Sequence, residues 1–216
     1  MHKTITDLNN TFATSDEHFW HANVIRYCER PFKDVEEMNE MMILHWNQTV
    51  KPSDKVFCLG DFSMAFRAVE TYTKRLNGYK ILVAGNHDFC HPAHKKSKTE
   101  ENQKKWIEKY HENGWDEVHI YGTIDIPGVA VVNVNHLPYL DPTQDLRHAK
   151  FRPTNDGRWL LCGHVHEKWA QREKMINVGV DVRNFKPMSF QEIASLIHNN
   201  PEGFPKLDFK PSTEDL

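Results

Sequence analysis

Short apolar runs that stop at a polar cluster recur along this chain. Their length, their β-branched residues and the glycine that ends three of them are typical of buried β-strands. We therefore predict five strands, each of which delivers polar side chains at its carboxyl end. The runs and their clusters are TFATSDEH (11–18), KVFCLGD (55–61), YKILVAGNHD (79–88), VAVVNVNH (129–136) and WLLCGHVH (159–166).

Patterns typical of helices lie between these runs. A helix over 34–47 is indicated by an aspartate at the N-cap position and an acidic first turn. The capping-box spacing of Ser189 and Glu192 predicts another over 189–198. Two more helices are predicted over 66–76 and 99–112, each with a glycine beyond its end. The alternation of strands and helices indicates an α/β sandwich in which helices cover the sheets.

The length of 216 residues fits one compact domain with a core of its own. We expect this single domain over 1–198, followed by an extended C-terminal tail over 199–216 that contains three prolines. The stretch 91–105 (HPAHKKSKTEENQKK) is polar and locally basic. It is expected either as a solvated loop entering a helix or as a flap beside the site.

Charge and cysteine usage exclude several classes of protein. With a formal net charge of -3, the chain has no global positive field, so strong nucleic-acid binding is not expected. A small phosphorylated substrate remains compatible, because bound metal ions carry their own positive charge. The four cysteines have no CxxC spacing, the N-terminus is polar, and no apolar run reaches membrane-spanning length. We therefore expect a cytoplasmic protein with no membrane association.

Several of the 14 histidines fall at the predicted strand ends, where they could bind a ligand. Ligands of α/β folds gather where the carboxyl ends of strands open into loops. The side chains delivered there are aspartate, asparagine and histidine, which suit divalent transition metals, whereas the lack of cysteine argues against structural zinc. Asp16 and His18 are two residues apart, as are His164 and His166, so each pair points the same way on an extended strand end.

Along the chain, the clusters are DEH, GD, GNHD, a histidine and GHVH, in this order. This series resembles the motifs of the calcineurin-like metallophosphoesterase superfamily and spans about 150 residues. The stretch 15–32 (SDEHFWHANVIRYCERPF) is further similar to the opening of small predicted phosphoesterases of bacteria and phages. The resemblance implies a four-layer α-β-β-α sandwich of two mixed β-sheets flanked by helices, with a dinuclear metal site at the strand ends.

The resemblance also implies a role for each motif residue. Asp61 would bridge two divalent metal ions, and a hydroxide between these ions would attack phosphorus in line. His87 would act as a general acid or hydrogen-bond donor toward the leaving oxygen. Manganese is the metal expected first, and iron, nickel, cobalt or zinc would also suit the ligands. The first metal would be held by Asp16, His18 and His166, and the second by Asn86, His136 and His164.

One departure from the superfamily bears on the substrate. In the phosphoprotein phosphatases GD continues as GDxVDRG, and its second aspartate orients the catalytic histidine, whereas here the run is Gly60-Asp61-Phe62-Ser63-Met64. We therefore expect a phosphodiesterase acting on a small soluble phosphoester such as a nucleotide derivative. The alternatives are a phosphomonoesterase, a nuclease, or a non-catalytic binding scaffold, although scaffolds usually have substitutions in the ligand set.

Residues near the motifs have two readings each. His21 and Asn23 either contact the ligands and substrate or form the polar start of a helix. Arg26 and Arg30 either bind a substrate phosphate or are ordinary surface charges. Trp20 either stacks on a base or packs, with packing favoured. Asn177 and Asp181 are expected to support the GHVH cluster rather than to catalyse.

Overall fold

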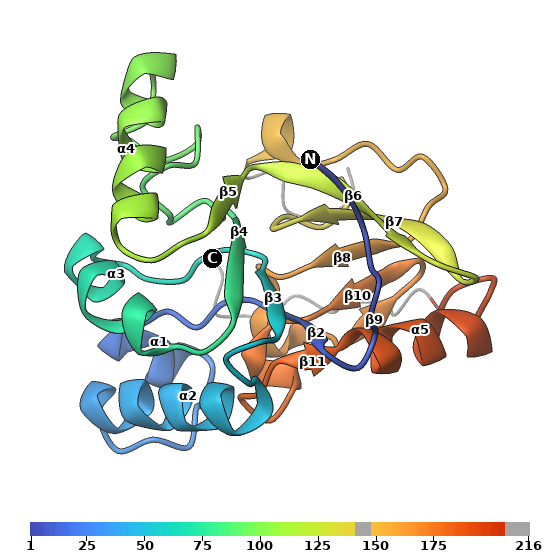
Figure 1. The fold of residues 1–216 in the computed structure, drawn as a ribbon, viewed down its shortest axis with the longest axis horizontal. Helices are drawn as coiled ribbons and strands as arrows, with labels where there is room; N and C mark the ends of the chain where they lie inside the picture. Colours follow the sequence, from blue (N-terminus) through green and yellow to red (C-terminus); the bar gives the residue numbers. More distant parts are fainter. Residues whose placement is uncertain (141–147, 206–216) are drawn as a thin grey trace, which may run out of the picture.

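The computed structural model describes residues 1–140 and 148–205, and it shows two mixed β-sheets flanked by helices (Figure 1). This confirms the predicted fold class. One sheet has six strands in the order β1 (His2–Thr4), β6 (Tyr121–Ile126), β7 (Ala130–Asn135), β8 (Leu160–Cys162), β10 (Met175–Asn177) and β9 (Gln171–Arg172). The other has five strands in the order β11 (Met188–Ser189), β2 (Thr11–Thr14), β3 (Lys55–Cys58), β4 (Tyr79–Val83) and β5 (Glu117–His119).

Parallel pairing brings the polar strand ends to one edge of each sheet. Strands β2, β3 and β4 run parallel, with Thr14 opposite Cys58 and Cys58 opposite Leu82. In the other sheet β7, β8 and β10 are also parallel to one another. Because the carboxyl ends of parallel strands meet at the same edge, the clusters that follow them in the sequence become neighbours in space.

The two larger of the three apolar cores formed by the described residues lie on either side of the five-stranded sheet. Val56, Cys58 and Leu82 face outward and pack with residues of the helices α1 (Ala22–Tyr27), α2 (Val35–Thr49), α3 (Phe66–Tyr72) and α4 (Glu100–Glu112). Phe57 and Ile81 point the other way, into a second core shared with the six-stranded sheet and with α5 (Phe190–Asn199). Strands β3 and β4 are thus buried on both faces, which explains why their sequences are continuous apolar runs rather than alternating ones.

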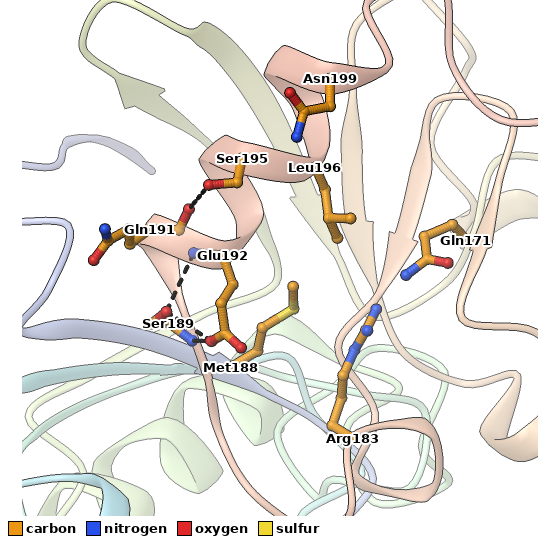
Figure 2. A pocket seen from close by; sticks show the side chains of 9 residues that line it. All are labelled: Gln171, Arg183, Met188, Ser189, Gln191, Glu192, Ser195, Leu196 and Asn199. Carbon is orange, nitrogen blue, oxygen red and sulfur yellow. Dashed lines mark hydrogen bonds between the residues drawn. The ribbon is translucent and has the colours of Figure 1, made fainter.

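The helix signals in the sequence correspond to real caps. Asp34 accepts a hydrogen bond from the backbone N–H of Glu37 at the start of α2, and α2 continues two residues past its predicted end. At α5 the Ser189 side chain accepts from the Glu192 N–H, and the Glu192 carboxylate accepts from the Ser189 N–H (Figure 2). The predicted helix over 66–76 is shorter, since its last turn is the 3-10 helix η1 (Thr73–Arg75).

Part of the predicted C-terminal tail is seen. Phe204 forms an isolated β-bridge with Glu173, and its ring centroid lies 5.9 Å from that of Trp159. Residues 206–216 of the predicted tail lie outside the described part of the chain. Within the described ranges, no helix has the length and apolarity required to cross a membrane.

Candidate metal centre

The strand ends bring two triads of potential metal ligands together. In each triad, one ligand atom of every member lies within 4.8 Å of the others. The triads are Asp16, His18 and His166, and Asp61, His136 and His164. Asn86 lies between Gly85 and His87, and His87 donates its backbone N–H to Asp61 Oδ1 over 2.8 Å. The motif residues of the sequence are therefore neighbours in the structure.

Unpaired polar atoms mark the same place. Asp16 Oδ1, His18 Nε2, Asn86 Oδ1 and His136 Nε2 are buried without a hydrogen-bond partner in the described structure. A buried polar atom without a partner costs free energy, so buried groups of this kind usually have a ligand, a water or an ion. All four atoms can offer a lone pair to a cation. The donor set therefore fits divalent metal ions with mixed nitrogen and oxygen ligands.

Unusual backbone conformations aim these side chains. Left-handed φ angles occur at Asp16 (62°), His18 (53°), Asp61 (52°), His164 (72°) and His166 (49°). Each such residue costs of order 1 kcal/mol or more and persists only where the surroundings enforce it. Here backbone bonds between the loops do so: the N–H groups of Asp16 and His18 donate to the carbonyls of Gly60 and Asp61. This strain at the proposed ligands is the kind found at functional sites.

Glycine is required where two loops touch. A Cβ on Gly85 would lie 2.3 Å from Asp61 Oδ1, and one on Gly163 would lie 2.3 Å from Asp16 Oδ2. Neither the Asp61 nor the Asp16 carboxylate could move away from such a Cβ without leaving the centre. The backbone therefore approaches the carboxylates closely at these two positions, and beside Gly163 the His164 N–H donates to Asp16 Oδ2 over 2.9 Å.

Hydrogen bonds fix how two histidines face the centre. His136 Nδ1 lies 2.8 Å from the carbonyl oxygen of Leu59, which can only accept, so Nδ1 carries a proton and Nε2 is turned toward Asp61. His166 Nδ1 lies 2.9 Å from Asp181 Oδ2 in the same manner. Such a bond to the remote ring nitrogen is the usual way to orient a metal-binding imidazole.

The charges of the centre are strongly coupled. Burial alone would lower the pKa of His136, but the adjacent Asp61 carboxylate raises this pKa to about 9. Burial alone would likewise raise the pKa of Asp61, yet His136, His87 and His18 hold it well below its ordinary value. Metal ions need neutral imidazoles, so binding would displace protons from the protonated histidines.

Asp88 is a structural residue of the site that the sequence reading did not single out. Its Oδ2 accepts hydrogen bonds from the backbone N–H groups of Asp61 and Gly85, over 2.9 and 2.8 Å. Its Oδ1 accepts from the Phe62 N–H over 3.3 Å. Burial raises the pKa of Asp88 to about 7. The signal was its place in GNHD, since an aspartate directly after a tight turn commonly binds backbone N–H groups.

His87 lies at the accessible side of the centre. Its side chain is 43% exposed, and its Nε2 lies 3.9 Å from Asp61 Oδ2. Among the described residues, no carboxylate comes within hydrogen-bond distance of this ring. This agrees with the absence of the second aspartate of GDxVDRG from the sequence.

The neighbouring residues separate into two groups. His21 is half-buried, with its Nδ1 3.4 Å from that of His18, while Asn23 and Arg26 are exposed at the start and end of α1. Arg30, in contrast, is buried, and all three of its guanidinium nitrogens donate to protein acceptors. This burial contradicts the phosphate contact predicted for Arg30, because the side chain has no accessible donor. The sequence could not show it, since arginine is usually a surface residue.

Two cavities lie away from the centre. One of about 480 Å³ is formed by α5, β9 and Arg183 (Figure 2). Another of about 440 Å³ lies between β6, β7 and the 3-10 helix η2 (Ala149–Phe151). Neither cavity is lined by a residue of the two triads, by Asn86 or by His87.

Similar proteins are found in archaea and phages. The chain is 31% identical to an uncharacterized protein of Methanocaldococcus jannaschii over 200 residues, which cover 88% of this chain and 92% of that protein. It is 29% identical to the Gene 66 protein of Mycobacterium phage L5, over 89% of this chain and 96% of the phage protein. The crystal structure of a protein of unknown function from Aquifex aeolicus matches with a TM-score of 0.61 and 26% identity, over 87% of this chain and 98% of that one.

The family model of the calcineurin-like phosphoesterase superfamily domain matches residues 13–188, a range that begins before Asp16 and ends after His166. It therefore includes both triads, Asn86 and His87. Proteins of this family bind divalent metal ions and hydrolyse phosphoesters. The chain belongs to the calcineurin-like phosphoesterase superfamily.

Proposed function

We propose that this protein is a dinuclear metal-dependent phosphodiesterase acting on a small phosphoester such as a nucleotide derivative. The observation that carries the proposal is the position of Asp61 between the triads. Its Oδ2 lies 3.2 Å from His136 Nε2 and 3.9 Å from His18 Nε2, so one carboxylate oxygen faces a histidine of each triad. A carboxylate placed in this way is suited to bridge two cations.

The remaining ligand roles follow from the triads. Asp16, His18 and His166 would hold one ion, while His136 and His164 would hold the other. Asn86, whose Oδ1 is buried without a hydrogen-bond partner, would join the second set. When bound, the two ions would polarise the phosphoryl oxygens and lower the pKa of a water molecule. Manganese is the first metal to test, and iron, nickel, cobalt and zinc are the others that this ligand set accepts.

His87 is the proposed proton donor. It belongs to neither triad, its ring centroid lies 5.7 Å from that of His18, and it is accessible to a substrate. A proton held on this imidazole would pass to the leaving oxygen as the ester bond breaks. Because a basic leaving oxygen needs a proton to depart, this acid step would matter most for substrates with poor leaving groups.

A line of side chains leads from the centre to solvent along α1. The His21 ring centroid lies 5.3 Å from that of His18 and 6.3 Å from that of Tyr27, and the Arg26 guanidinium lies 5.3 Å from the Tyr27 ring. Tyr27 is 60% exposed, and Arg26 forms no ion pair within the described residues. An exposed aromatic ring beside an unpaired cation suits a phosphorylated aromatic compound. His21, Asn23 and Arg26 are therefore the proposed substrate contacts.

The cellular setting is also proposed. All four cysteines are free thiols, which is typical of proteins in a reducing compartment. We therefore place the protein in the cytoplasm, where small phosphoesters are available as substrates.

The test is hydrolysis of bis-p-nitrophenyl phosphate by metal-stripped protein, with and without added Mn²⁺. We expect turnover that depends on the metal and falls by orders of magnitude in Asp61→Asn, because this change weakens the binding of both ions. Absence of turnover with every candidate metal would contradict the proposal and favour a binding protein.

The same assay decides between the alternative activities. p-Nitrophenyl phosphate, cyclic nucleotides and oligonucleotides are compared with the diester at equal concentration. A monoester hydrolysed faster by orders of magnitude would replace the phosphodiesterase with a phosphomonoesterase. Preference for oligonucleotides would make the protein a nuclease.

A further inference from the structure

A buried ion pair lies directly behind the first triad. Arg30 Nε lies 2.7 Å from Asp181 Oδ1, and another guanidinium nitrogen of Arg30 donates to Asp181 Oδ2 over 2.9 Å. The exposed fractions of the two side chains are 0% and 2%. Both side chains are therefore removed from solvent and bonded to each other at two points.

Each partner also reaches a different loop of the triad. Asp181 Oδ2 accepts from His166 Nδ1 over 2.9 Å. The Arg30 guanidinium donates to the carbonyl oxygens of Asp16, over 2.7 Å, and Glu17, over 3.0 Å. The pair thus joins the DEH loop after β2 to the GHVH loop after β8, which belong to different sheets.

Stability is a poor reason to keep such a pair. Burying two charges costs several kcal/mol of desolvation, and apolar residues of similar size often stabilise a protein as well or better. What apolar residues lack is the ability to hold an imidazole at a set angle and to bind two carbonyl oxygens. Both loops bear left-handed residues, Asp16 and His166 among them, so their conformations need external support.

We infer that Arg30 and Asp181 are positioning residues for the first metal site. Asp181 keeps a proton on His166 Nδ1 and thereby turns Nε2 toward Asp16 Oδ1, 4.0 Å away. Arg30 fixes the backbone that carries Asp16 and His18 and holds Asp181 in place. The inference rests on the proposed metal-binding role of the first triad, and it does not depend on which phosphoester is hydrolysed.

Metal titration of the full chain tests the inference without any substrate. Mn²⁺ binding to metal-stripped protein is followed by calorimetry, and the product by electron paramagnetic resonance, in which two neighbouring Mn²⁺ ions give a spin-coupled signal. In Asp181→Asn, and in the double variant Arg30→Met with Asp181→Leu, we expect one of two binding events to weaken 10–100-fold. The other should stay within about twofold, and the spectrum should change from coupled to mononuclear.

The double variant and a control variant protect this result from a folding artefact. The double variant replaces the charges with apolar side chains of similar volume, so it avoids leaving one charge buried alone. Arg75→Met with Glu40→Leu removes another bidentate pair, which is exposed and lies on α2 and η1. This control should bind two ions as the unchanged protein does.

The outcomes separate the possibilities. If the double variant bound both ions normally while its metal-free form melted at a lower temperature, the pair would be structural only and the inference would be wrong. Equal weakening of both events would contradict a role confined to the first site. If the unchanged protein bound fewer than two ions, the dinuclear site of the proposed function would fail, whereas its hydrolysis of a diester would be judged by the separate assay.

Discussion

At the scale of single residues, Asp61 contacts several other residues of the centre. Its Oδ1 accepts the His87 N–H, its Oδ2 faces His18, His87 and His136, and its own N–H donates to Asp88. Its backbone is left-handed, with a φ of 52°. Asp61 is a member of the second triad, whereas His87 belongs to neither triad, so changes at Asp61 and at His87 should have different consequences.

His87→Ala should separate chemistry from metal binding. We expect both ions to remain bound while kcat falls about 100-fold or more for diesters with poor leaving groups, since the proton donor is lost. For p-nitrophenyl esters, whose leaving group needs no proton, the loss should be much smaller. Turnover of both substrate types is compared alongside calorimetric titration with Mn²⁺. An emptied metal site in this variant would mean that His87 is a ligand and that its proposed role is wrong.

Residue types and their spacing predicted positions that the structure brings together in the two triads, because metal chemistry restricts the possible ligands to a few side chains. They did not suffice for Arg30, which was expected at the surface beside Arg26 and is instead buried against Asp181. Both arginines follow the same motif, and nothing in the local sequence distinguishes them. The difference arises from a contact between residues 151 positions apart, which only the folded chain reveals.

At the scale of elements, α1 is the helix that connects the centre to solvent. Its start was predicted only as one of two readings of His21 and Asn23, because its six residues are too few for a clear helical pattern and His21 offers no side-chain cap. β5 was missed because it has three residues. β6 is longer and lies between β1 and β7, but only every second residue of it is buried, so it is not a continuous apolar run. Strands β3 and β4, in which every residue but the first is buried, were found, since burial on both faces leaves the clearest signal.

Arg26→Ala tests the substrate-binding role of α1. Loss of a charge-assisted contact to a second part of the substrate should raise KM about tenfold and leave kcat within about twofold. The measurement uses thymidine 5′-p-nitrophenyl phosphate, which carries a base, and bis-p-nitrophenyl phosphate, which does not. Arg75→Ala, on η1, is the control and should change neither constant. An unchanged KM for the nucleotide ester would remove Arg26 from the site.

At the scale of the whole molecule, a polar contact joins the edges of the two sheets. Lys3 of β1 donates to Glu117 of β5 over 2.7 Å, and the other Glu117 oxygen lies 2.8 Å from His119 Nε2. Partial burial would raise the pKa of Glu117, but the bonds from Lys3 and His119 outweigh it and lower the pKa to about 2. The contact is independent of the metal centre and should respond to pH by itself.

Glu117→Gln should destabilise the metal-free protein at pH 7, with an effect that disappears in acid. The pKa of the carboxylate is lower in the folded protein than its ordinary value of 4.5, so its contribution to stability is complete above about pH 4.5 and is lost as the pH falls toward 2. The midpoints of urea unfolding for the variant and the unchanged protein should therefore approach each other over this range. A difference that stayed constant with pH would show that the charge of Glu117 is irrelevant.

The two triads also bear on how long the protein survives in the cell. Each triad takes residues from both sheets, and the His164 N–H already bonds to an aspartate 148 positions earlier in the chain. Ions held there would cross-link the sheets and close very long loops, which raises the free energy of partly opened forms. Such forms are the ones that proteases cleave. Metal supply would then govern the turnover of the protein itself, so a cell short of the metal would lose the protein as well as its activity.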